Sequence, residues 1–142
     1  MFDKILVPVD LNQKSSWEKA LPVAISMAQQ NNAELVVMSV VPNYGSSLVG
    51  SFFPPDYSEK VLQDAEAELA KLVASEVPAD IETSSHVIFG TIYKRILKTA
   101  DAVGASLIVL ASHRPEMQDY LLGPNAARVV RHATQSVFVV RG

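Results

Sequence analysis

The feature that most constrains the fold is a strict alternation along the chain between short apolar runs and segments with helical periodicity. Nearly continuous apolar runs at residues 4–10, 35–41 and 106–111 are typical of strands covered on both faces of a parallel sheet. Two further strands are expected at 81–88, which alternates loosely between apolar and polar residues, and at 136–141. Because a helix is expected between each pair of strands, the sequence predicts right-handed crossovers and a parallel sheet with helices on both faces.

The helices are placed by the spacing of their apolar residues and by the residues at their ends. The first is expected to begin at a capping serine, Ser15 or Ser16. Pro22 then fits only near the first turn or at a kink. The other helices are expected from 58 to about 75, from 92 to a closing glycine at Gly104, and from 125 to 133.

Composition indicates an ordinary globular chain of 142 residues, for which a single domain at 1–142 is expected. The absence of cysteine excludes disulfides, thiolate zinc sites and a cysteine nucleophile. The net charge is −3 and the Lys and Arg residues are scattered, so neither a nucleic-acid groove nor a polybasic membrane patch is predicted. Without a signal-peptide pattern or an apolar stretch of about 20 residues, a soluble, cytoplasmic protein with no membrane span is expected.

The ligand site of such a sheet lies beyond the carboxyl ends of the strands, where the strand order reverses. The first strand ends at Val9-Asp10 and the fourth at Ala111-Ser112. After the fourth, Gly123 precedes an expected helix, whose free N–H groups and dipole favour an anion. Gly123 permits close approach of a phosphate, and Arg114 could supply a charged hydrogen bond. The alternative is an ordinary loop with a glycine turn.

No catalytic or metal-ligating residues are predicted. The three histidines are not at metal-ligand spacing; His132 is expected in the last turn of a helix and His86 on a strand face. Ser112 and His113 are adjacent, an arrangement that seldom lets a nucleophile and its base face each other, and no orienting acid is evident. Neither a P-loop nor a dinucleotide fingerprint occurs.

The connection at 42–58 is longer than most loops in compact domains. It carries Phe52 and Phe53, which would be covered either by a ligand or partner or by the neighbouring helix. Whether this connection acts as a lid stays open.

Three segments carry a resemblance to a known family: residues 5–10, 106–115 and 121–141. Together they resemble universal stress proteins, and in particular the small bacterial members lettered F and G. The resemblance implies a three-layer α/β domain like the adenine-nucleotide α-hydrolases, with a five-stranded parallel sheet of order 3-2-1-4-5. It also implies a homodimer built through the last strand, where an apolar sheet edge offers a pairing surface: Val137, Phe138, Val139 and Val140.

The resemblance further assigns nucleotide contacts. Asp10 would accept from the ribose hydroxyls, although a turn or capping role after the strand is the alternative. Pro8 and Val9 would flank the adenine, and Val40 would meet it through its backbone and by apolar contact. The remaining positions belong to the phosphate segment: Ala111, Ser112, His113, Arg114, Gly123, Pro124, Asn125 and Ala126.

The phosphate segment departs from the Gly-x2-Gly-x9-Gly-Ser/Thr pattern of nucleotide-binding members. Ala111 and Arg114 stand at the first two glycine positions, and the gap to Gly123 is one residue shorter. Pro124 replaces the Ser or Thr and offers neither an N–H nor a hydroxyl. At least one phosphate contact of the pattern is therefore absent.

The resulting expectation is a stress-response regulatory homodimer that binds ATP, ADP or AMP, with Mg²⁺ bridging Asp10 and the phosphates as an option. No cofactor is expected to be needed for folding. The alternatives are a weak ATPase or autophosphorylating protein, and a nucleotide-free module that acts through an unknown protein partner.

Overall fold

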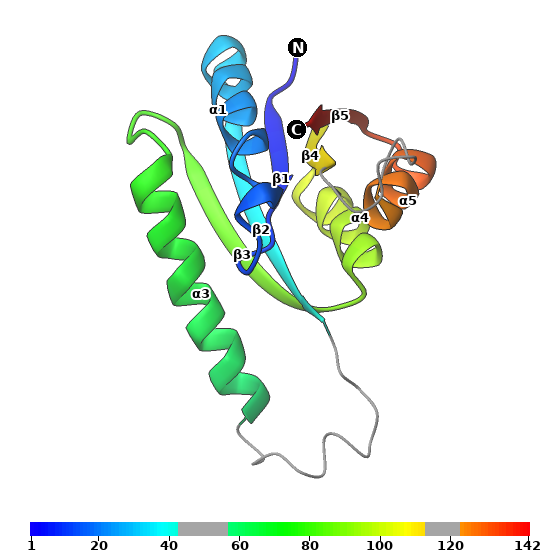
Figure 1. The fold of residues 1–142 in the computed structure, drawn as a ribbon. Coiled ribbons are helices and arrows are strands. Elements are labelled where there is room, and N and C mark those ends of the chain that lie inside the picture. The colour runs from blue at the N-terminus through cyan, green and yellow to red at the C-terminus, as the bar shows by residue number, and fades with distance from the viewer. Residues whose placement is uncertain (43–56, 113–122) are drawn as a thin grey trace.

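The computed structural model describes residues 1–42, 57–112 and 123–142. In these ranges a central sheet lies between two layers of helices (Figure 1). The elements in chain order are β1 (Lys4–Pro8), the 3-10 helix η1 (Lys14–Ser16), α1 (Ala20–Asn31), β2 (Glu34–Pro42), α3 (Tyr57–Glu76), β3 (Thr83–Gly90), α4 (Ile92–Val103), β4 (Leu107–Ser112), α5 (Pro124–His132) and β5 (Ser136–Arg141).

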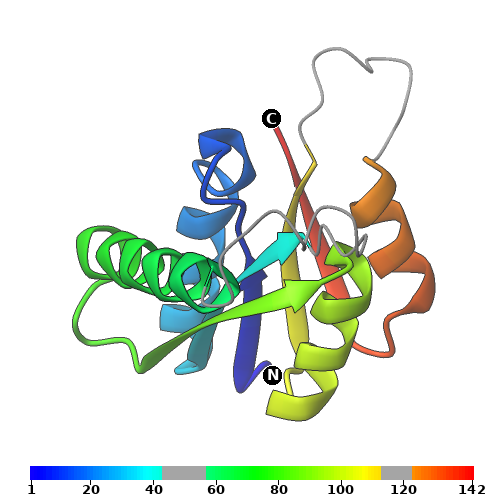
Figure 2. The same cartoon turned by 90° about the horizontal axis from the view of Figure 1, so that it is seen from below.

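The sheet is parallel throughout, and its strand order is β3-β2-β1-β4-β5, which confirms the predicted order. The chain runs outward from β1 through β2 to β3, and then returns to the other side of β1 to form β4 and β5. The order therefore reverses between β1 and β4. The connection after β1 leads to β2 on one side of this point, and the connection after β4 leads to β5 on the other side. Figure 2 shows the strands with their helices on either side.

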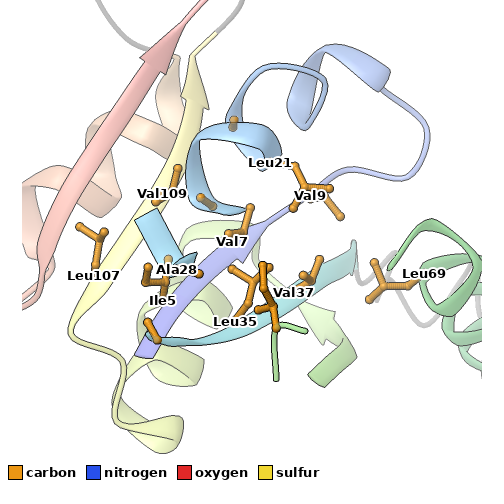
Figure 3. Packing of buried hydrophobic residues seen from close by; sticks show 14 of the residues in the cluster. Ile5, Val7, Val9, Leu21, Ala28, Leu35, Val37, Leu69, Leu107 and Val109 are labelled. Atoms are coloured by element: carbon orange, nitrogen blue, oxygen red, sulfur yellow. The ribbon is translucent and has the colours of Figure 1, made fainter. Parts of the chain in front are cut away.

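Alternate residues of the central strands enter two separate cores. Ile5 and Val7 of β1 pack beneath α1 and α3 with Leu35 of β2 and Leu69 of α3, and all four are fully buried (Figure 3). Leu6, between Ile5 and Val7, faces the second core beneath α4 and α5. Burial on both faces explains why these strands read as continuous apolar runs.

The predicted serine cap of the first helix is wrong. Helix α1 begins at Ala20, and its N-cap position, Lys19, makes no side-chain cap hydrogen bond. Ser16 folds the preceding loop instead: its Oγ accepts from the Asp10 N–H at 2.8 Å and donates to the Gln13 carbonyl at 2.7 Å. With this later start, Pro22 lies in the first turn of α1, where a helix needs no N–H.

The other boundaries lie close to those predicted. Strand β3 is displaced by two residues from 81–88, and α5 begins at Pro124. His86 is exposed on β3 and His132 lies in the last turn of α5, as predicted. Within the ranges given above, no helix combines the length and the apolar character that crossing a membrane would require.

Gly104 ends α4 in the left-handed conformation, with φ +72°. We expect Gly104→Ala to lower the free energy of unfolding by about 1 kcal/mol, because an L side chain is strained there. No heavy atom lies within 4 Å of the added Cβ, so the loss comes from the backbone alone. Gly104→Asn is the matched variant and should lose less, since asparagine tolerates this conformation. Urea denaturation measures both; equal stability of the alanine variant and the parent would contradict the expectation.

Candidate functional site

A cavity of about 1110 Å³ opens at the carboxyl ends of β1, β2 and β4. This volume lies just above the range of roughly 300–1,000 Å³ that is usual for small-molecule sites. Its position is the reversal point of the strand order, where ligands of doubly wound sheets bind. Its lining comes from the ends of the three strands, the β1–α1 loop, and helices α3, α4 and α5.

The sheet edge supplies the central part of the lining. Pro8, Val9 and Asp10 follow one another at the end of β1, and Val9 is tied to β2 by its N–H, which donates to the Met38 carbonyl at 2.8 Å. Strand β2 contributes residues 39–42 and β4 contributes residues 110–112. Because all three strands run in the same direction, their ends meet at one side of the sheet.

Asp10 lies exposed on the cavity wall and also shapes its own loop. Its Oδ1 accepts from the Asn12 N–H at 2.9 Å, an Asx turn. Its backbone N–H donates to Ser16 Oγ, and its carbonyl accepts from the Gln13 N–H at 3.0 Å. The turn role considered from the sequence is therefore present. This turn holds the Asp10 carboxylate in place beside the cavity.

The start of α5 forms another part of the wall. Gly123 is buried at the N-cap, and its carbonyl accepts from the Ala127 N–H at 2.9 Å. The N–H groups of Asn125 and Ala126 precede this first helical hydrogen bond, and both residues line the cavity. Free N–H groups at a helix start provide a favourable setting for an anion.

Pro124 lies differently from the other members of the predicted phosphate segment. It occupies the first position of α5, which suits its fixed φ. It is exposed and does not belong to the residues that line the cavity.

The structure thus brings together most of the predicted ligand residues around one cavity. His113 and Arg114 lie outside the described residues, as do Phe52 and Phe53 of the long connection. The predicted residues that do line the cavity are Pro8, Val9, Asp10, Val40, Ala111, Ser112, Gly123, Asn125 and Ala126.

Sequence reasoning missed the contribution of α3. Val61, Asp64, Ala65 and Glu68 line the cavity from this helix, which covers the opposite face of the sheet from α5. The available signal was the placement of Asp64 and Glu68 beside the apolar stripe of the helix. Ser39 was also missed, although a serine that is 4% exposed within an otherwise apolar strand is itself informative.

Further lining residues come from α4, namely Ile92 and Ile96. Across residues 1–42, 57–112 and 123–142, no group of three or more His, Cys, Asp or Glu side chains is arranged to hold a metal ion.

The family model of universal stress proteins matches residues 1–141. The chain belongs to the universal stress protein family. Universal stress protein G of Shigella flexneri is 31% identical over an alignment of 144 residues, gaps included, which covers 99% of this chain and 100% of that protein. Universal stress protein G of Salmonella typhimurium is 32% identical over 145 residues, with the same coverage. The resemblance inferred from the sequence is thereby confirmed.

Solved structures show the universal stress protein fold for this chain. Hypothetical protein MJ0577 superposes with a TM-score of 0.82 at 20% identity, over 100% of this chain and 97% of that one. The universal stress protein UspA from Lactobacillus plantarum gives a TM-score of 0.75 at 24% identity, over 98% of this chain and 97% of that one. A universal stress protein in complex with cAMP gives a TM-score of 0.64 at 23% identity, over 99% of this chain and 97% of that one.

Proposed function

We propose that this universal stress protein is a regulatory homodimer that binds an adenine nucleotide in the cavity at the carboxyl ends of the strands. The observation that carries the proposal is the convergence of Asp10 and the N-terminus of α5 on one cavity of nucleotide size. A family relative of the same fold has been solved in complex with cAMP, which supports a nucleotide as the ligand class.

The charges around the cavity favour one orientation of the nucleotide. Asp64 and Glu68 line it from α3, and Asp10 lines it from the end of β1. Carboxylates accept from the ribose hydroxyls and from an exocyclic amino group. The free N–H groups of α5 lie on the other side of the sheet and suit the phosphates. The base and sugar therefore lie toward β1 and α3, and the phosphates toward α5.

Nucleotide binding is tested directly on the purified protein. Mass spectrometry of the denatured protein should reveal co-purified adenine nucleotide, and calorimetric titration with ATP, AMP and cAMP should give a measurable heat. If neither method detects a nucleotide, the proposal fails. The chain would then be assigned to the nucleotide-free interaction module, the alternative that Pro124 and Ala111 favour. ATP turnover by the loaded protein would instead support the weak ATPase.

The homodimer is proposed to form through the free edge of β5. This strand pairs with β4 on one side and lies at the end of the sheet. Phe138 is 45% exposed there, and its neighbours Val137, Val139 and Val140 are half-buried. An apolar edge strand is a template for pairing with a second copy. Light scattering at micromolar concentration should give twice the mass of one chain; the mass of one chain would remove the dimer from the proposal.

Replacement of Pro124 tests how the start of α5 meets the phosphates. We expect Pro124→Ser to raise the affinity for ATP about threefold to tenfold, because it restores an N–H and adds a hydroxyl beside the phosphate site. Pro124→Ala restores the N–H alone and should give a smaller gain. Calorimetric titration compares the two. Because Pro124 is exposed and outside the cavity lining, an unchanged affinity in both variants would mean that the phosphates do not reach this turn.

A further inference from the structure

Charge is unevenly distributed between the two helical layers. Helix α4 carries three basic residues and one acidic residue, and α5 carries two arginines and a histidine with no acidic residue. On the opposite face of the sheet, α3 carries five acidic and two basic residues. The chain as a whole has a net charge of −3. The layer formed by α4 and α5 is therefore a basic surface on an acidic protein.

The outer surface of this layer presents the basic face, which we define as Lys94, Lys98, Arg128, Arg131 and His132. All five side chains are exposed. On α4 the two lysines are four residues apart, and on α5 Arg131 and His132 follow Arg128 by three and four residues. These spacings place the members from each helix on one side of it.

Tyr93 joins the two halves of the basic face. The Arg128 guanidinium lies over the Tyr93 ring at 5.0 Å from its centroid, and the His132 ring centroid is 6.5 Å from that of Tyr93. Helices α4 and α5 run side by side on the same side of the sheet (Figure 1). The cations of the two helices therefore belong to one continuous surface.

The basic face is not neutralised from within the part of the chain that the structure describes. The single carboxylate of α4 and α5 belongs to Asp101, which accepts from the neutral Gln135 Nε2 at 2.7 Å and offsets at most one of these cations. The ion pair between Lys4 and Glu34 involves no member of the basic face. The cations of the basic face are therefore available to charges of another molecule.

We propose that the basic face is a docking surface for an acidic segment of another protein. Charge complementarity assigns carboxylates to the partner, spaced to meet the cations of both helices. The surface also offers apolar contact, because the Tyr93 ring is half-buried between the two helices. Amino-acid side chains use such contacts, whereas a phosphate backbone does not. A nucleic acid needs a longer basic stripe and would be repelled by the acidic remainder of the molecule.

The docking surface shares its helices with the cavity. Ile92 and Ile96 of α4, and Asn125 and Ala126 of α5, line the cavity from the inner sides of these helices. A partner on the basic face would therefore contact the two elements that form one wall of the ligand site. The docking surface itself depends on no ligand and stands apart from the proposed nucleotide binding.

The test uses a fluorescein-labelled acidic helical peptide with glutamates four residues apart and one leucine per turn. Fluorescence anisotropy with the full chain should show saturable binding that weakens as salt is added. The double variant Arg128→Glu/Arg131→Glu should raise Kd by about tenfold or more. The matched control, Lys60→Glu/Lys71→Glu, changes the net charge equally on exposed positions of α3 and should change Kd by less than about twofold.

Three results would overturn the proposal. They are no binding of the peptide, equal weakening in the two double variants, or tighter binding of a single-stranded DNA oligonucleotide or of phosphatidylserine vesicles than of the peptide. Circular dichroism establishes that each variant is folded. If Arg128→Glu/Arg131→Glu does not fold, Lys94→Glu/Lys98→Glu takes its place, with the same tenfold loss expected and an unchanged Kd as the contradicting result.

Discussion

Replacement of Asp10 by alanine is expected to lower the affinity for adenine nucleotide by about 10- to 100-fold. A hydrogen bond to a charged group contributes about 1.5–3 kcal/mol, which corresponds to a loss of this size. In the proposed complex the carboxylate of Asp10 accepts from the ribose at the end of β1. The alanine variant also loses the acceptor for the Asn12 N–H, so part of its effect comes from a loosened loop.

Asp10→Asn separates these two contributions. The amide oxygen can still accept from the Asn12 N–H, which keeps the turn, while the charge and one acceptor are lost. We expect this variant to bind about tenfold more weakly than the parent in calorimetric titration. The control is Asp80→Asn, which makes the same charge change at an exposed position between α3 and β3, at the opposite end of the sheet. If Asp10→Asn binds with the parent's affinity, the ribose contact is refuted and only the turn role of Asp10 remains.

The fold was predictable because burial on both faces of the sheet leaves a direct mark on the sequence. Leu35, Val36 and Val37 are all at most 1% exposed, so the strand reads as an unbroken apolar run. The start of α1 was not predictable from capping preferences, because Ser16 has closer hydrogen-bond partners in the loop than in the helix. A local signal fails where a nearby tertiary contact uses the same side chain.

The candidate site also contains residues that the sequence predicts and residues that depend on packing. Residues at the strand ends, such as Val9 and Ala111, follow from topology, since parallel strands must end at the same edge. The wall formed by Asp64 and Glu68 depends on how α3 packs across the sheet, and spacing along α3 does not encode that angle. Pro124 belongs to the phosphate segment by its place in the chain and lies exposed outside the cavity lining, so the Pro124→Ser and Pro124→Ala variants decide whether this position contacts a phosphate.

The core beneath α1 and α3 gives the largest expected effect on stability. Leu35 is fully buried in β2, where it pairs with Ile5 of β1 and Thr83 of β3. Leu35→Ala leaves an empty space in the core that the neighbouring strands cannot move to fill. The free energy of unfolding should therefore fall by about 2–5 kcal/mol. That is a large share of the about 5–15 kcal/mol of a typical domain. Urea denaturation should show a lower midpoint with an unchanged slope.

Val130→Ala provides the matched control for this prediction. It also removes methyl groups, but from a side chain that is 43% exposed on α5, so the change should stay within about 0.5 kcal/mol. All measurements need one protein concentration, because the stability of a dimer depends on it. If Leu35→Ala cost no more than Val130→Ala, the contact between β2 and the helices above it would not be the source of stability. The shape of the cavity at the end of β2, which depends on the same packing, would then need another explanation.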